Sequence, residues 1–271
     1  MKNNLFCVEG KVIAITGGYG VLGTQMAIYL AGQGAKVVIL GRSKEKGENL
    51  VERIRESGGE AAFFVSDVLN QDNLEQNQKD ILKVFGKLDV LINAAGGNMP
   101  GATIPPDKTI FDVEVKAFKD VIDLNLFGTV LPTLVFSKTM VNNGKGNIIN
   151  IASMSSFRPL TRVMGYGVAK AAIANFTEYM AGELATKFGD NFRVNALAPG
   201  FFITEQNRNL MLNPDGSYSE RAKTVLAHTP FRRFGKSEEL LGAIHYLASD
   251  ASSFVNGTVL VVDGGFNSYS I

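Results

Sequence analysis

The chain has 271 residues, a formal net charge of +1 and one cysteine, Cys7. Its length suits a single α/β domain, and its 45% share of hydrophobic residues can fill a large core. The near-neutral charge gives no electrostatic reason to expect binding to nucleic acid or to an anionic membrane. A lone cysteine excludes an internal disulfide. Residues 1–11 lack the apolar core of a signal peptide, and no uncharged apolar run is long enough to span a bilayer. We therefore expect a cytoplasmic protein that contacts no membrane.

Short apolar runs alternate with longer helical patterns along the whole chain. The runs that predict strands are 11–16, 36–40, 61–65, 88–93, 148–152, 192–196 and 258–262. The segments that predict helices are 21–32, 44–56, 71–85, 112–141, 163–188 and 238–248. This alternation indicates an α/β fold, a Rossmann-type, doubly wound parallel sheet of about seven strands with helices on both faces. No repeat or linker divides the chain, so we expect a single domain over residues 1–271.

Two connections in this pattern are unusually long. Residues 96–109 carry three prolines, and residues 201–235 are rich in polar and charged side chains. Long loops in a compact domain are often the walls or lids of a functional site. We expect both segments to border such a site.

A glycine-rich turn follows the first predicted strand and precedes the first predicted helix. Gly18, Gly20 and Gly23 form the pattern G-x-G-x-x-G. Glycines at these places allow a tight turn and a close approach to a pyrophosphate, which the helix N-terminus then binds. The alternative is a purely structural glycine turn. The cofactor-binding residues predicted in this segment are Gly17, Gly18, Tyr19, Gly20, Val21, Leu22 and Gly23.

The choice between NAD(H) and NADP(H) depends on the end of the second strand. A carboxylate that binds the adenosine ribose is expected there, but Gly41 occupies the place and Arg42 follows it. An arginine without the acid suits a 2′-phosphate, so the sequence favours NADP(H), with NAD(H) as the alternative. In that alternative, Arg42 is only a solvated loop charge.

Two further strand ends supply candidate cofactor contacts. Asp67 lies after the third strand and is followed by Val68. Its carboxylate can accept a hydrogen bond from the adenine amino group. The alternative is that Asp67 is a helix N-cap. Asn93, Ala94, Ala95 and Gly96 end the fourth strand and bring small residues against the cofactor, although a glycine there also suits a simple turn.

Tyr166 and Lys170 lie four residues apart on a predicted helix and therefore share one face. A free tyrosine has a pKa near ~10, and a neighbouring cation pulls that pKa toward the working range of a proton carrier. Ser153 follows the fifth strand at its carboxyl end, where open α/β sheets bind ligands, and can hold a substrate oxygen against the phenol. The pair alone is also compatible with an ordinary amphipathic helix surface.

Together these motifs are similar to those of the short-chain dehydrogenase/reductase superfamily over nearly the whole chain. Asn93-Ala-Ala-Gly96 resembles its NAG-type motif, and Val261-Val-Asp263-Gly-Gly its last-strand motif. One departure is Val21, which stands where the superfamily has its middle glycine; Gly20, one place earlier, can replace it. The resemblance implies a homotetramer and no metal site. It also implies the catalytic set Asn125, Ser153, Tyr166 and Lys170, with Tyr166 and Lys170 also contacting the cofactor, and Pro199, Gly200, Phe202 and Thr204 lining the nicotinamide.

Within the superfamily, several segments resemble the D-mannonate oxidoreductases (fructuronate reductases), among them AAGGNMPGAT, FRPLTRVMGY and PGFFITEQNR. The resemblance implies interconversion of D-fructuronate and D-mannonate, and the sequence thus predicts a sugar-acid substrate. Cations or amide donors must then face its carboxylate. The alternatives are a polyol, gluconate or 3-oxoacyl substrate, or a non-catalytic dinucleotide sensor. The predicted substrate-binding residues are Asn98, Ser153, Arg158, Arg162, Gln206 and Arg208.

Overall fold

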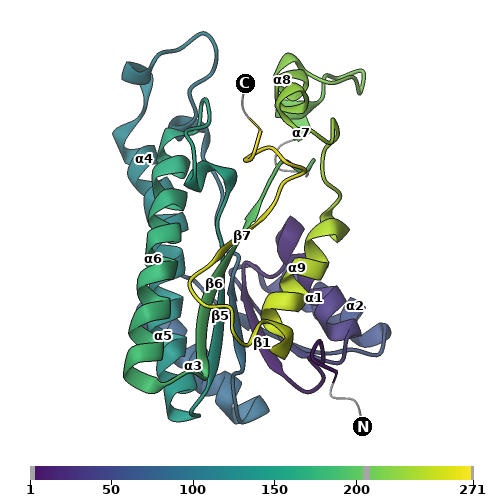
Figure 1. Cartoon of the computed structure of the whole chain (residues 1–271), viewed down its shortest axis with the longest axis vertical. Coiled ribbons are helices and arrows are strands. Elements are labelled where there is room, and N and C mark those ends of the chain that lie inside the picture. The colour runs from purple at the N-terminus through teal and green to yellow at the C-terminus, as the bar shows by residue number, and fades with distance from the viewer. Residues whose placement is uncertain (1–3, 204–207, 270–271) are drawn as a thin grey trace.

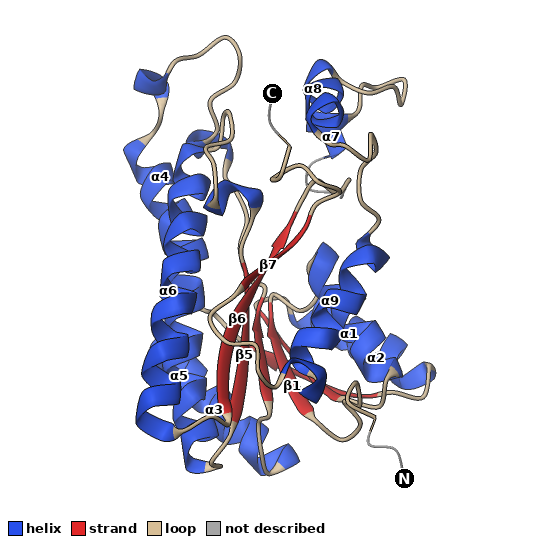
Figure 2. Cartoon of the chain, in the orientation of Figure 1, coloured by secondary structure: helices blue, strands red, loops and turns tan. Residues whose placement is uncertain are grey.

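The computed structural model describes residues 4–203 and 208–269. Its centre is one parallel sheet of seven strands in the order β3-β2-β1-β4-β5-β6-β7, with helices on both faces (Figure 2). The predicted Rossmann-type fold is confirmed. The strands are β1 Val12–Thr16, β2 Lys36–Gly41, β3 Glu60–Val65, β4 Val90–Asn93, β5 Gly146–Ile151, β6 Phe192–Pro199 and β7 Val259–Val262. The helices are α1 Val21–Gly32, α2 Lys44–Glu56, α3 Gln71–Phe85, α4 Val115–Ile122, α5 Gly128–Asn142, α6 Met164–Phe188, α7 Arg208–Met211, α8 Glu220–His228 and α9 Leu241–Ala248.

Alternate side chains of β1 enter two separate cores, because successive residues of a strand point to opposite faces of the sheet. Ile13 and Ile15 pack in the core beneath α1, α2 and α9, whereas Val12 and Ala14 pack in the core beneath α3, α5 and α6. Figure 1 shows these two helical layers on either side of the strands. All four side chains are fully buried, so both faces of the sheet exclude water.

Two segments differ from the sequence prediction. The helix expected over 112–141 begins at Val115 and is interrupted by a π-helical turn, Asp123–Phe127, between α4 and α5. The connection 201–235 is no plain loop, since it contains α7 and α8 (Figure 1). Neither helix is apolar enough along its length to stand out from a polar loop by its sequence pattern. The helix α8 instead begins at a side-chain cap, in which Ser219 accepts a hydrogen bond from the Ala222 backbone N–H.

The helical stretch Val115–Asn142 is long and apolar enough, by length and composition alone, to cross a membrane. Half of its most apolar window is buried inside the protein, and its α5 part carries one wall of a core. The core helix of a globular α/β domain meets the same criterion. The absence of membrane contact stays a prediction.

The turn between β1 and α1 is built from glycine because other backbone atoms crowd it. Gly17 has φ +62°, and a Cβ there would lie 2.8 Å from the Ala95 Cα. A Cβ at Gly23 would lie 2.5 Å from the Gly17 carbonyl oxygen. Real Cβ atoms do not approach backbone so closely, so the turn and the first turn of α1 pack together only with glycine at these positions.

We expect Gly23→Ala to lower the free energy of unfolding by about 1–3 kcal/mol, because the new methyl group forces the turn apart. Gly32→Ala is the matched control, since Gly32 ends the same helix with nothing within 4 Å of its would-be Cβ. This control should be neutral or stabilise by up to ~1 kcal/mol. Urea unfolding curves of both variants give the comparison. Equal stability of the two variants would contradict the close packing described here.

Candidate active site

Ser153, Tyr166 and Lys170 meet at the carboxyl end of β5. Ser153 follows the strand, and Tyr166 lies in the first turn of α6 with Lys170 one turn further on. The Lys170 Nζ donates a hydrogen bond of 2.6 Å to the Ile151 carbonyl oxygen at the end of β5. The same Nζ lies 5.5 Å from the centroid of the Tyr166 ring. The structure thus brings together the three residues that the sequence predicted to act as a unit.

Burial shifts the pKa values of Tyr166 and Lys170. Desolvation raises the pKa of Tyr166, and a hydrogen bond with Ser153 lowers it by less. Desolvation also lowers the pKa of Lys170 to about 8. Tyr166 is therefore protonated at neutral pH and can donate a proton, while the ammonium beside it favours the phenolate that donation leaves behind. The expectation that the neighbouring cation lowers the pKa of Tyr166 is therefore wrong, because desolvation by burial outweighs the interactions that favour the phenolate.

Asn125 lies fully buried in the π-helical turn between α4 and α5. Its side-chain Nδ2 donates to the Gly97 carbonyl at 2.7 Å and to the Val121 carbonyl at 2.8 Å, and its Oδ1 accepts from the Gly97 N–H at 3.1 Å. A Cβ at Gly96 would lie 2.6 Å from that Oδ1 and 3.6 Å from the Lys170 Nζ. Asn125 therefore fixes the loop after β4 against the buried lysine, and its direct catalytic role stays a prediction.

The glycine turn and the start of α1 fit a dinucleotide. Gly20 is the N-cap of α1 and makes no side-chain cap, and the first turn of the helix carries no acidic residue. Its N–H groups and the positive end of the helix dipole are thus available to an anion. Gly20 and Val21 are both exposed, with Gly20 in extended conformation, so the turn is formed although Val21 replaces the usual glycine. The predicted residues from Gly17 to Gly23 can hold a pyrophosphate there.

The end of β2 is shaped by Tyr19. Its hydroxyl accepts a hydrogen bond of 2.7 Å from the Ser43 backbone N–H, and its ring lies over Gly41, in the space that a Cβ at this position would enter. A carboxylate at position 41 would displace this ring. Arg42, the next residue, is exposed and close to the same strand end. The Tyr19 ring therefore fills the space that the side chain of the expected acid would occupy. The sequence pattern did not reveal this contact.

The other predicted cofactor residues lie at neighbouring strand ends. Asn93 is buried and donates from Nδ2 to the Thr133 hydroxyl and to the Asn150 side chain, both at 2.9 Å. The Thr16 hydroxyl, which the sequence analysis missed, holds Ala94 and Ala95 by their N–H groups at 3.1 and 3.2 Å.

Asp67 is exposed and accepts from the Leu69 N–H at 3.0 Å, next to the buried Val68. Its alternative interpretation as a helix N-cap is wrong, because Asn70 caps α3. Its proposed adenine contact stays a prediction.

The structure separates the predicted substrate residues. Arg158 donates to the Asn267 carbonyl oxygen and lies 6.0 Å from the Phe266 ring, so it packs on the C-terminal segment. Asn98 donates to the Thr103 hydroxyl at 2.8 Å within its own loop. Arg208 is exposed at the start of α7. Arg162 remains beside the catalytic helix, two residues before α6. The predicted residues Thr204 and Gln206 lie outside the described residues.

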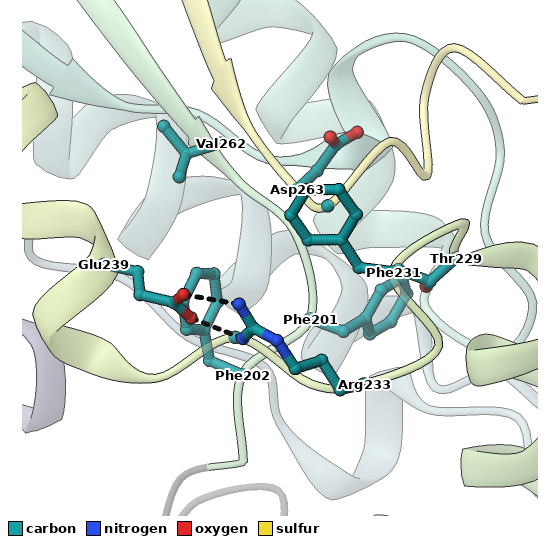
Figure 3. Close-up of a pocket in the computed structure, with 10 residues that line it drawn as sticks. Phe201, Phe202, Thr229, Phe231, Arg233, Glu239, Val262 and Asp263 are labelled. Carbon is teal, nitrogen blue, oxygen red and sulfur yellow. Dashed lines mark hydrogen bonds and ion pairs between the residues drawn. The ribbon is translucent and has the colours of Figure 1, made fainter.

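A separate pocket of about 90 Å³ opens beyond the carboxyl ends of β6 and β7. Phe201, Phe231 and Asp263 line it together with the Arg233–Glu239 ion pair, whose N–O distances are 2.7 and 2.6 Å (Figure 3). Phe202, predicted to contact the nicotinamide, packs here against Gly235 and the core. Pro199 and Gly200 lead into this region from β6, where Gly200 donates to the Val262 carbonyl at 2.9 Å.

A parallel sheet with a glycine turn before α1 and a buried lysine beside a tyrosine defines a nicotinamide-dependent oxidoreductase of Rossmann type. The family model described as Enoyl-(Acyl carrier protein) reductase matches residues 20–267. The chain belongs to the short-chain dehydrogenase/reductase family, and it is an NAD(P)-dependent oxidoreductase acting on CH–OH groups.

Relatives share nearly the whole chain. The uncharacterized oxidoreductase UxuB of Bacillus subtilis (strain 168) is 44% identical over 97% of this chain and 97% of its own. A solved structure from Haemophilus influenza, provisionally described as a D-mannonate oxidoreductase with bound NAD, has a TM-score of 0.90 at 42% identity and covers 97% of each chain. The gluconate 5-dehydrogenase of Burkholderia cenocepacia J2315, in complex with NADP and tartrate, has a TM-score of 0.87 at 32% identity and covers 98% of this chain and 99% of its own.

We expect Tyr166→Phe to lower kcat by ~10²-fold or more, because general acid–base help of this kind is typically worth ~10²–10⁴ in rate. Cofactor affinity should barely change, since the ring and its packing remain. Tyr179→Phe is the matched control, being a 65% exposed tyrosine on the same helix, and it should leave kcat unchanged. Steady-state rates and NAD(P)H fluorescence titrations measure the two effects. Near-normal kcat in Tyr166→Phe would remove this residue from the mechanism.

Proposed function

We propose that the protein interconverts a keto sugar acid and the corresponding hydroxy acid, with D-fructuronate and D-mannonate as the pair. The observation that carries the proposal is the Ser153–Tyr166–Lys170 group, in a chain 42% identical over 97% of its length to the structure provisionally described as a D-mannonate oxidoreductase. A non-catalytic dinucleotide sensor has no need to keep a buried lysine beside a protonated tyrosine. The interpretation of the protein as an enzyme is therefore favoured over its interpretation as a non-catalytic sensor.

In the direction of reduction, the bound nicotinamide cofactor supplies a hydride to the substrate carbon. Ser153 donates a hydrogen bond to the substrate oxygen and holds it beside the phenol. Tyr166 gives its proton to that oxygen, which becomes the hydroxyl of the product. Lys170 stabilises the resulting phenolate, and its buried position keeps this attraction strong. Asn125 keeps the loop around Gly97 in place, so the groups need no reorganisation during the reaction.

The two candidate sugar acids have the same separation between the reacting carbon and the carboxylate. In D-fructuronate and in 5-keto-gluconate alike, four C–C bonds separate the reacting carbonyl carbon from the carboxylate carbon, a span of about 5 Å. One site geometry with a cation at that distance can accept either. The 3-oxoacyl alternative needs an apolar channel and a basic mouth for its carrier, which the net charge of +1 does not favour. Sugar acids are therefore the preferred class, with a cytoplasmic homotetramer as the expected form.

We expect the protein to reduce D-fructuronate with a kcat/KM at least ~10²-fold above that for the neutral ketose D-fructose, because an unpaired buried charge penalises the neutral substrate. A panel of D-fructuronate, 5-keto-D-gluconate, D-fructose and an acetoacetyl thioester, followed by NAD(P)H absorbance, measures the preference. A higher kcat/KM for 5-keto-D-gluconate would move the assignment to the gluconate pair. Preference for D-fructose or the thioester would overturn the sugar-acid proposal.

NADP(H) is proposed as the preferred cofactor. The support is Arg42 beside a strand end with glycine in place of the acid and with Tyr19 filling the space. A charge-assisted contact to the 2′-phosphate contributes roughly 1.5–3 kcal/mol, or about tenfold to hundredfold in affinity.

Arg42→Met should therefore weaken NADPH binding about tenfold to hundredfold and leave NADH binding unchanged. Arg53→Met is the matched control, because Arg53 is also exposed and lies on the helix that follows. Titrations that follow nicotinamide fluorescence give both dissociation constants, free of protein tryptophan because the chain has none. Tighter binding of NADH than of NADPH by the unmodified protein would contradict the proposal and leave Arg42 as a solvated charge.

A further inference from the structure

Two arginines from distant parts of the chain approach each other beside the catalytic helix. Arg162 lies in the segment between Ser153 and Tyr166, and Arg221 lies in the first turn of α8, within the long connection after β6. Both side chains are half-buried. The sequence analysis named Arg162 and missed Arg221, because nothing in a polar connection marks one charge above the others.

Arg221 is held in place by the segment that carries Arg162. Its Nη1 donates to the Thr161 hydroxyl at 2.9 Å, and its Nη2 donates to the Thr161 carbonyl oxygen at 3.3 Å. These bonds join α8 to the residue directly before Arg162. These bonds use two of the five N–H donors of the Arg221 guanidinium, so within the described residues the others remain for another partner.

Arg162 is held by its backbone in an unusual conformation. Its φ is +75°, which is rare for a residue other than glycine, asparagine or aspartate. Its carbonyl oxygen accepts a hydrogen bond of 3.0 Å from the Ile104 N–H in the connection 96–109. Three segments therefore converge at residues 161–162: both long connections and the loop that leads into α6. Strained backbone of this kind persists only where the surroundings determine it, and it is frequent at ligand sites.

The guanidiniums of Arg162 and Arg221 carry like charges and repel each other. Burial and the nearby charge of Arg162 both lower the pKa of Arg221. Over residues 4–203 and 208–269, no carboxylate lies within ion-pair distance of either arginine. Like charges brought together and partly desolvated are costly, and an anion between them would remove that cost.

We propose that Arg162 and Arg221 together bind the carboxylate of the substrate, so that Arg221 on α8 is a specificity-determining residue. The inference rests on the proposed sugar-acid function and names the side chains that recognise the acid. Arg162 lies four residues before Tyr166, in the segment that joins Ser153 to Tyr166, so the pair is anchored to the segment that carries the proposed proton donor. Arg158 instead donates to the Asn267 carbonyl and packs on the Phe266 ring, so it is held on the C-terminal segment.

The arginine pair also explains how α8 can take part in recognition. The carboxylate joins α8 to the loop before α6, which adds to the two bonds that Arg221 already makes to Thr161. A neutral ketose cannot make this link and leaves both charges unpaired. Selectivity for the acid then comes from the attractive contact and from the penalty on the neutral substrate.

The test compares Arg221→Met, Arg162→Met and the control Lys223→Met. Lys223 is an exposed cation on the same helix and forms an ion pair with Glu220, so its replacement removes one charge outside the arginine pair. We expect Arg221→Met and Arg162→Met to lose roughly 10- to 100-fold in kcat/KM for D-fructuronate. Their rate on D-fructose should stay the same or rise, because one of the two unpaired charges is gone. Lys223→Met should match the unmodified protein on both substrates. The rate on D-fructose also reports that the variants are folded.

A second measurement separates this inference from the proposed function. Calorimetry gives the dissociation constants of D-mannonate and of the neutral polyol D-mannitol for each protein saturated with oxidised cofactor. Binding of D-mannonate should weaken about 10- to 100-fold in both arginine variants, with partial rescue in Arg221→Lys, which keeps the charge but not the planar fork. If the unmodified protein binds D-mannonate without turnover, the proposed function fails while the binding constants still decide the role of the pair. Unchanged acid binding in both variants, or no acid binding by the unmodified protein, would overturn the inference.

Discussion

The buried ammonium of Lys170 is the constraint on which the site depends. Lys170 is 4% exposed, and within the described residues the Ile151 carbonyl is its one hydrogen-bond acceptor. An ammonium has three N–H donors, so two of them remain available for ligand oxygens. Such contacts would offset the free-energy cost of burying the charge. The hydroxyl of Ser156 also donates to the Lys170 carbonyl at 2.7 Å. The end of β5, the turn after it and α6 are thus held together around one cation.

A network of buried amides and hydroxyls makes the floor of the site rigid. Asn93 on β4 contacts Asn150 on β5 and Thr133 on α5, and Asn150 donates to the Thr177 hydroxyl on α6 at 2.9 Å. All four side chains are at most 1% exposed. This buried network fixes the relative positions of two strands and two helices, and among the described residues the Asn93 Oδ1 has no hydrogen-bond partner in it. The catalytic groups above it therefore keep their geometry without help from a ligand, which is what electrostatic preorganisation requires.

The sequence predicted what short-range spacing determines and missed what tertiary contacts determine. The positions of α2 and α3 and the shared face of Tyr166 and Lys170 follow from local periodicity, and the structure has them as expected. The direction of Arg158 does not, because the C-terminal segment that holds it lies 109 residues away along the chain. The approach of Arg221 to Thr161 spans 60 residues, and α8 has a weak apolar face, so no local pattern could reveal either one.

These contrasts divide the molecule into a rigid catalytic floor and variable walls. The floor consists of strand ends and α6, where the buried network and Lys170 leave little room for substitution. The walls are the connections 96–109 and 201–235. Both bond to residues 161–162, the first through the Ile104 N–H and the second through two bonds from Arg221. Because loops tolerate change better than the elements they connect, substrate choice can vary there while the proton chemistry below stays the same. Under the proposed role of Arg162 and Arg221, a change of substrate class would require replacement of these wall cations rather than of Ser153, Tyr166 or Lys170.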